Sequence, residues 1–218
     1  MTNIKHELLT RISLISFIII WFALLYFYKI SPGFTQEALL KLPTALAIYM
    51  FLNFIFTKWF WRLPFLQGWL IQFPDLQGTW QGVLQTTWKN PETGEIPGPI
   101  PMILVIKQSF KTINCVMYTQ ESTSYSNASM LSEDDESGIK RLSYNYTNTP
   151  DITIRGRSAM HHGAAILRIV KEKGKYTLQG EYWTSRNTAG TIKLKLRSKE
   201  SLGTFPEDLI PKKRKSEK

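Results

Sequence analysis

Tyrosine and serine side chains recur at strand spacing in the second half of the chain. Residues two apart on a β-strand share a face, so Tyr144 and Tyr146 point the same way. For the same reason Ser124, Ser126 and Ala128 share a face of another predicted strand. Aromatic rings stack on nucleobases, and an arginine guanidinium meets phosphate oxygens in a planar fork. If these faces line a cavity, they suit a flat anionic ligand, and the candidate binding residues are Ser124, Ser126, Tyr144, Tyr146, Arg155, Tyr182, Thr184 and Arg186.

The tyrosines also have a purely structural interpretation. They could fill an ordinary packed core with their hydroxyl groups at its rim. Alternation alone does not choose between a cavity wall and a packed core, so both interpretations stay open at this point.

The sequence carries no pattern typical of a metal site or a catalytic centre. No phosphate-binding loop, GxSxG turn or HExxH helix is present. His161 and His162 are adjacent, so on a strand their rings point to opposite faces. Cys115 is the sole cysteine and lies in an apolar run, which is typical of a core residue and excludes an intrachain disulfide. We therefore expect no cofactor and no metal, and little in the sequence suggests an enzyme.

These residues must be positioned by a β-domain. Alternating polar and apolar stretches, separated by turn signals, predict eight strands in sequence without long helices between them. This arrangement predicts a compact eight-stranded antiparallel up-and-down β-barrel, whose interior holds packed side chains or one small ligand. The predicted strands cover residues 79–88, 102–110, 113–120, 123–131, 139–147, 161–170, 175–184 and 189–198.

Two uncharged apolar runs precede the barrel and predict an N-terminal two-helix transmembrane hairpin. A helix needs roughly 17 to 25 apolar residues to cross the hydrocarbon, and we expect helices over about 12–30 and 42–61. A cleaved signal peptide fits poorly, because the first run is too long and no small-residue cleavage site follows it. A buried helical hairpin fits poorly because neither helix keeps a polar face. The predicted organisation is a hairpin over 1–66, a linker over 67–74, a barrel over 75–198 and a flexible basic tail over 199–218.

The formal net charge is +10, and most of the excess lies in the membrane flanks and the tail. A protein that binds nucleic acid polymers would concentrate basic residues on its folded domain, so we do not expect such a partner. Basic residues flank the outer ends of both apolar runs, which predicts that both termini and the barrel lie in the cytoplasm. The flanks would also meet anionic membrane lipid.

The chain resembles a known family in three features. These are the two predicted transmembrane helices and the segments Asp75–Gly82 and Tyr182–Gly190. Together they resemble the two-helix, β-strand-rich effectors of cyclic-oligonucleotide-based antiphage signalling systems (CBASS). The resemblance implies a compact barrel that binds a cyclic dinucleotide made by a partner nucleotidyltransferase. It also implies a homo-oligomer on activation, disruption of the cell inner membrane and abortive infection. Within the second segment, the resemblance assigns ligand binding to Arg186 and Thr188.

Arg186 has a competing role, and the barrel has competing functions. In barrels that open with Gly-x-Trp, here Gly78–Trp80, a late cation often lies across the tryptophan ring and closes the barrel floor. A membrane-anchored, lipocalin-like carrier would have an apolar cavity without an arginine. A structural docking module would have a filled barrel.

Overall fold

The computed structural model describes residues 6–210 of the 218-residue chain. Its contacts divide the chain into two compact units. One unit contains Leu76–Gln108 and the residues from Thr112 onward, and the other contains the residues up to Asp75 together with Ser109–Lys111.

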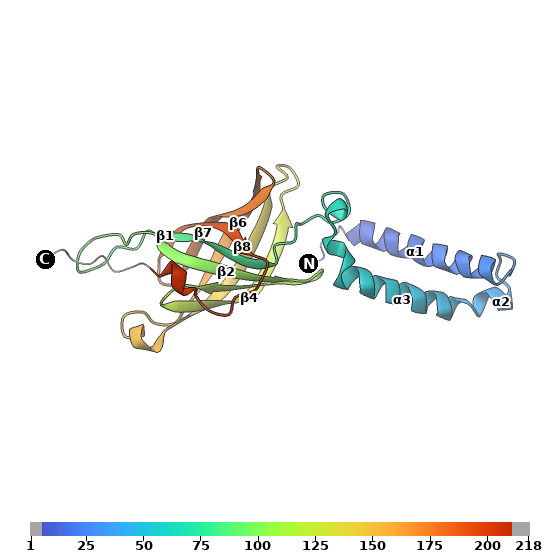
Figure 1. Ribbon diagram of the computed structural model, residues 1–218, viewed down its shortest axis with the longest axis horizontal. Coiled ribbons are helices and arrows are strands. Elements are labelled where there is room, and N and C mark those ends of the chain that lie inside the picture. The colour runs from blue at the N-terminus through green and yellow to red at the C-terminus, as the bar shows by residue number, and fades with distance from the viewer. Residues whose placement is uncertain (1–5, 211–218) are drawn as a thin grey trace. The chain divides into compact units, whose positions relative to one another are not determined.

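The first unit is a closed antiparallel barrel in which every strand pairs with the next and β8 pairs with β1 (Figure 1). This confirms the predicted up-and-down fold. The largest difference from the predicted bounds is in β5, which continues to Pro150 rather than ending at residue 147. The strands are β1 (Gly78–Thr86), β2 (Ile100–Gln108), β3 (Ile113–Tyr118), β4 (Ser122–Glu133), β5 (Lys140–Pro150), β6 (His161–Glu172), β7 (Lys175–Thr184) and β8 (Ala189–Ser198).

A two-residue turn joins β6 to β7 at Lys173 and Gly174. Their φ angles are 48° and 78°. Two successive positive φ angles are typical of the tight hairpin turn whose twist matches antiparallel strands. The predicted turn at residues 172–174 is therefore present.

One half of the barrel interior is filled with large apolar side chains. Trp80 is fully buried, and its indole nitrogen donates to the carbonyl oxygen of Leu76 at 2.8 Å. The core also contains fully buried leucines from β2, β5, β6 and β7, namely Leu104, Leu142, Leu167 and Leu178. In the register of β1 with β8, Trp80 pairs with Leu196, whereas Thr86 pairs with Gly190 at the other end of the barrel. We call these ends the Trp80 end and the Thr86 end.

A β-bulge interrupts the alternation of β4. Ser126 pairs with Tyr146 and Ala128 with Asn145, so Asn127 is the extra residue. The bulge turns Ala128 outward, where it is exposed, while Ser124 stays buried. The prediction that Ala128 shares a face with Ser124 and Ser126 was therefore wrong.

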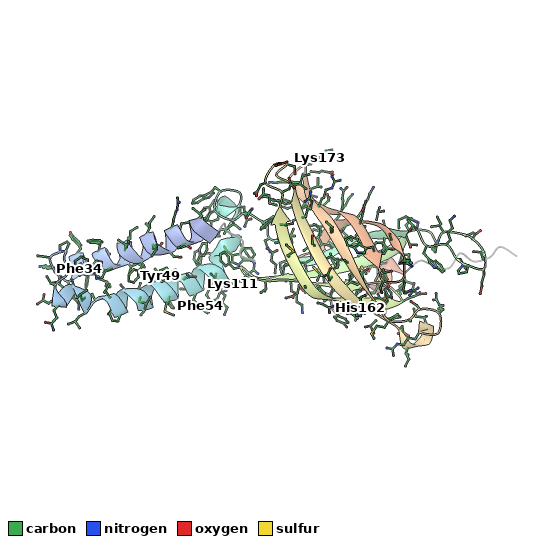
Figure 2. The ribbon with its side chains drawn as sticks, turned by 180° about the vertical axis from the view of Figure 1, so that it is seen from behind. Phe34, Tyr49, Phe54, Lys111, His162 and Lys173 are labelled. Atoms are coloured by element: carbon green, nitrogen blue, oxygen red, sulfur yellow. The ribbon has the colours of Figure 1, made fainter. Side chains whose placement is uncertain are left out.

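The second unit contains helices α1 (His6–Phe27), α2 (Gln36–Leu39) and α3 (Leu42–Lys58). Phe17 of α1 meets Tyr49 of α3 edge to face, with ring centroids 6.4 Å apart. Figure 2 labels Tyr49 and Phe54 along α3, and Phe34 in the connector between α1 and α2. Two stretches, Thr10–Phe27 and Gln36–Lys58, are long and apolar enough to cross a membrane. The structure thus contains two apolar helices that could span a bilayer.

Two short 3-10 helices, η1 (Phe60–Arg62) and η2 (Pro64–Leu66), follow α3. Trp61 is fully buried there in an apolar cluster with Leu66, Ile71 and Phe110. Phe110 lies in the turn between β2 and β3 and meets the Trp61 ring at a centroid distance of 6.2 Å. Ile71 belongs to the segment predicted as a linker, so part of that segment contributes to a packed core.

Residues 199–210, the first part of the segment predicted as a flexible basic tail, make specific contacts with the barrel. The Thr79 hydroxyl donates to the Glu200 carbonyl at 2.6 Å, and Leu202 N donates to the same hydroxyl oxygen at 3.1 Å. Arg197 also binds both carboxylate oxygens of Asp208 at 3.0 Å. A short 3-10 helix, η4 (Glu207–Leu209), ends the described segment (Figure 1). The basic part of the predicted tail, residues 211–218, lies outside the described residues.

Candidate ligand-binding site

A cavity of about 820 Å³ opens at the Thr86 end of the barrel. Ligand pockets of proteins commonly measure about 300 to 1,000 Å³. The walls come from the ends of β1, β3, β5 and β7, the beginnings of β2, β4 and β6, and the loops that join them. A docking module with a filled barrel is therefore excluded for this end of the fold.

Two tyrosine rings, those of Tyr146 and Tyr182, form part of the cavity wall. Each ring occupies space that a glycine on a neighbouring strand leaves open. Gly163 pairs with Tyr146, and a Cβ atom there would overlap the Tyr146 ring. Gly190 pairs with Tyr182, and a Cβ atom there would lie 2.6 Å from Cε1 of that ring. The glycines thus allow both rings to lie inside the barrel.

Both phenols stay neutral near neutral pH. Burial raises the pKa of Tyr146, and the nearby Tyr182 raises it further. Burial also raises the pKa of Tyr182, although a hydrogen bond with Thr86 opposes the shift. Neutral tyrosines present polar hydroxyl tips and uncharged ring faces, which suits stacking with a flat ligand.

Arg186 supplies positive charge to the cavity from the turn between β7 and β8. Its Nη1 donates to Ser158 Oγ at 3.0 Å, and the side chain is exposed to the cavity. Among the described residues, no carboxylate lies within ion-pair distance of this guanidinium. Arg157, the other arginine in the wall, is paired with Glu121 at 2.6 Å. The charge on Arg186 is therefore available to an anion.

Hydroxyl groups and a histidine surround this arginine. Thr184 and Thr188 lie with their Oγ1 atoms 2.6 Å apart, and Arg186 N donates to Thr184 Oγ1 at 3.2 Å. His161 also lines the cavity, whereas His162 points out of the barrel and is exposed (Figure 2). Burial lowers the pKa of His161, and the charge on Arg186 lowers it further. His161 is therefore neutral near pH 7, and the two rings lie on opposite faces as predicted.

Asn148, near the end of β5, completes the polar wall. It is 6% exposed, and its Nδ2 donates to Ser122 Oγ at 3.0 Å and to Ser124 Oγ at 2.9 Å. Ser124 is thus buried behind Asn148 rather than open to the cavity, and only Asn148 and Ser122 reach the lining.

The structure brings together some of the predicted site residues. Tyr146, Tyr182, Thr184, Arg186 and Thr188 line the cavity.

The other predicted residues lie outside the lining. Tyr144 is buried deeper in the barrel, with its ring centroid 5.9 Å from that of Tyr146. Ser124 binds Asn148, and Ser126 Oγ accepts from Cys115 N at 2.9 Å. Arg155 follows the short helix η3 (Ile152–Ile154), and its Nε donates to the Pro150 carbonyl at 3.2 Å. The two serine hydroxyls and Nε of Arg155 therefore each have a partner in the protein, and Tyr144 lies in the core.

The competing role of Arg186 as a barrel floor is wrong. Trp80 lies at the opposite end of the β1–β8 register from the turn that carries Arg186. Among the described residues, no cation lies over the Trp80 ring. An apolar carrier is also disfavoured, since it requires a cavity without arginine and this one contains Arg157 and Arg186.

Sequence reasoning missed several wall residues. Asn148 continues the alternation of Tyr144 and Tyr146, so a predicted strand one residue longer would have included it. Arg157 and Ser158 lie in the loop between β5 and β6, where no periodicity indicates which side chains turn inward. Gly163 and Gly190 gave a usable signal, because glycine inside a strand often marks a close approach of another group.

Residues 71–196 match the family model described as "Cap15, cyclic dinucleotide receptor domain". The chain belongs to this Cap15 family. The match runs from the segment before β1 into β8 and therefore includes the barrel and most of its cavity wall. The chain is also similar to CD-NTase-associated protein 15 of Staphylococcus schleiferi, with 32% identity over 90 residues. That alignment covers 41% of this chain and 46% of the relative, so the chain spans about half the length of the curated protein it matches. The resemblance to CBASS effectors is confirmed at the level of the family.

Proposed function

We propose that the barrel binds one cyclic dinucleotide in the cavity at the Thr86 end, and that the chain is a CBASS effector. The observation that carries the proposal is the placement of the Arg186 guanidinium, which has no carboxylate partner among residues 6–210, in one cavity with the rings of Tyr146 and Tyr182. A cyclic dinucleotide offers the matching groups, namely two flat bases and two phosphates. The description of the Cap15 family as cyclic dinucleotide receptors supports the same ligand class.

The two tyrosines and the arginine have distinct roles in this proposal. Bases stack on Tyr146 and Tyr182, and such stacking contributes about 1–3 kcal/mol per base. A phosphate binds the Arg186 guanidinium, with the hydroxyl groups of Thr184 and Thr188 beside it. Hydrogen bonds to charged groups contribute about 1.5–3 kcal/mol each. Tyr144, Ser124, Ser126 and Arg155 affect binding only by supporting the wall.

Calorimetry with full-length protein in detergent micelles tests the proposal. The titrants are cyclic di-GMP, cyclic di-AMP, cyclic GMP–AMP and cyclic di-UMP, with a fatty acid as the apolar competitor. Arg186→Ala is expected to lower the affinity for the best ligand by roughly 10- to 150-fold, which is the equivalent of one hydrogen bond to a charged group. Arg168→Ala is the matched control, because Arg168 is exposed on β6 and lies outside the cavity lining. Binding of the fatty acid alone, or of no titrant, would contradict the proposal.

The proposed action takes place at the cell inner membrane, with both termini and the barrel in the cytoplasm. A ligand transmits a signal only if it favours one state of the protein over another. We infer that the occupied barrel favours a homo-oligomer. Chains held in one membrane are already concentrated, so a modest gain in affinity suffices for assembly.

Assembly would crowd the apolar hairpins and disturb the lipid around them. The exposed aromatic side chains Phe22, Tyr26, Phe51 and Phe54 are available for such contacts. The cellular outcome in this proposal is abortive infection, after a partner nucleotidyltransferase has made the ligand. Dye release from liposomes that contain the full chain, with and without the best cyclic dinucleotide, tests this step. Release that does not depend on the ligand would contradict it.

A further inference from the structure

The side-chain amide of Asn148 is held in one orientation at the cavity wall. Both of its N–H groups are used, one on Ser122 Oγ and one on Ser124 Oγ. The Ser122 hydroxyl lies 3.1 Å from Thr119 Oγ1 and can donate its own proton there, which leaves its lone pairs to Asn148. The amide is therefore fixed by β4 and by the turn that precedes it.

The carbonyl oxygen of this amide is left for a ligand. Among the described residues, Oδ1 of Asn148 has no hydrogen-bond partner, although the residue is only 6% exposed. Oδ1 is not one of the fully buried polar atoms that lack a partner, so it keeps some exposed surface. Because Asn148 lines the cavity, that surface is reached from the cavity. A nearly buried acceptor without a partner is costly, and most such groups in folded proteins are satisfied. An N–H group of a bound ligand would satisfy this one.

The position of Asn148 indicates which part of a ligand it meets. Asn148 and Tyr146 lie two residues apart on the same face of β5, so a ring stacked on Tyr146 brings its edge toward Asn148. Arg186 belongs to a different part of the wall, because β6 and β7 separate β5 from the turn that carries it. The cavity thus has a cationic part for phosphate and a separate acceptor beside an aromatic ring.

We propose that Asn148 is a specificity-determining residue whose Oδ1 accepts a hydrogen bond from the exocyclic amino group of a nucleobase. This inference rests on the proposed function, since it concerns the same cavity. Adenine, guanine and cytosine carry such an amino group, and uracil does not. A site built to bind a polar group rejects ligands that lack it, because its own group is then left unpaired.

The first test uses the unmodified full-length protein and needs no substitution. Two of the titrants are compared with analogues that lack only the amino group. Cyclic di-GMP is compared with cyclic di-IMP, and cyclic di-AMP with its unsubstituted-purine counterpart. For the better-bound pair, deletion of the amino group is expected to weaken binding by about tenfold or more. Equal affinities within both pairs would overturn the inference.

The second test asks whether Asn148 is the partner of that group. Asn148→Leu keeps a similar side-chain volume and removes the amide, and it is expected to bind both members of the pair with the same, weaker affinity. Asn145→Leu is the matched control, because Asn145 lies on the same strand but is exposed on the outer face. If Asn148→Leu does not fold, Asn148→Ser replaces it. A folded variant that still discriminates the pair by tenfold would overturn the inference.

Failure of this inference and failure of the proposed function give different results. If the unmodified chain binds no cyclic dinucleotide, the proposed function fails and the inference fails with it. If it binds them, and Arg186→Ala weakens all of them while Asn148→Leu leaves their ranking unchanged, only the inference fails.

Discussion

Gly163→Ala should destabilise the barrel through one identifiable clash. Gly163 lies on β6 between Tyr146 of β5 and Thr184 of β7. A Cβ atom at this position would overlap the Tyr146 ring, lie 2.5 Å from the Tyr146 hydroxyl oxygen and lie 2.7 Å from the Trp183 carbonyl oxygen. The carbonyl belongs to the backbone and cannot rotate away, so the strand, the ring or both must move.

The expected size follows from the cost of adding a carbon to a packed site. Overpacking of this kind costs about 1–3 kcal/mol. For chains of this size, 1 kcal/mol lowers Tm by roughly 2–4 °C, so the expected loss is roughly 2–12 °C. Since the Tyr146 ring lines the cavity, a shift of the ring should also lower the affinity for the best cyclic dinucleotide. Intrinsic-fluorescence melting of full-length protein in detergent measures the first effect, and calorimetry measures the second.

Two further variants make the test specific. Gly156→Ala is the matched control, because a Cβ atom there meets nothing within 4 Å and the φ angle is not positive. It should change stability by no more than about 1 kcal/mol. In a Tyr146→Ala background, Gly163→Ala should cost less, since the two nearest atoms that the new Cβ would meet, both in the Tyr146 side chain, are then absent. The reasoning is refuted if Gly163→Ala melts like Gly156→Ala, or if removal of the Tyr146 ring leaves the cost unchanged.

Three other predictions concern buried groups of the barrel. The buried Tyr144 hydroxyl has no hydrogen-bond partner in the part of the chain that the structure describes, so Tyr144→Phe should raise stability by about 1 kcal/mol without changing ligand affinity. A drop in melting temperature would show that the hydroxyl has a partner. Burial raises the pKa of Tyr144 and of Tyr146 above the ordinary value of 10.0. Their contribution to stability is therefore complete below pH 10 and declines as the pH rises above it. A Tm that is flat to pH 11, or a decline of Tm with pH that Tyr144→Phe leaves unchanged, would contradict this. Burial raises the pKa of the Cys115 thiol to about 12, so iodoacetamide at pH 8 should label the unfolded chain but not the folded one; rapid labelling of the folded protein would contradict this burial.

The barrel could be predicted because its strands keep the period of two almost without interruption. Inward residues such as Leu142, Tyr144 and Tyr146 alternate with polar ones, and each strand ends at a turn signal. Because each strand forms a hairpin with the next, the strands follow one another around the barrel in chain order. Pairing of β8 with β1 then removes the exposed sheet edges. The bulge at Asn127 made the prediction for β4 wrong. One extra residue moves every later side chain of the strand to the opposite face, and the composition of the strand does not indicate it.

The site was harder to predict than the fold because alternation gives the face of a residue but not its height. Tyr144 and Tyr146 share the inner face of β5, yet one is sealed in the core and the other lines the cavity. The height of each residue depends on the stagger of eight registers around the barrel, which no single strand contains. Arg157 and Ser158 needed the path of a loop, and loop side chains follow no period.

The division between a packed half and a hollow half follows from residue size at matched registers. Toward the Trp80 end, the inward residues are Trp80, Leu104, Leu142, Leu167 and Leu178, and their combined volume closes the barrel. Toward the Thr86 end, several inward positions hold glycine or a polar residue that is hydrogen-bonded to the wall, including Gly163, Gly190 and Asn148. An eight-stranded barrel has room for either side chains or one small ligand. In this chain glycine, serine and asparagine take the place of leucine at inward positions of β4, β5, β6 and β8, which leaves that room at one end, where the rings of Tyr146 and Tyr182 form part of the wall.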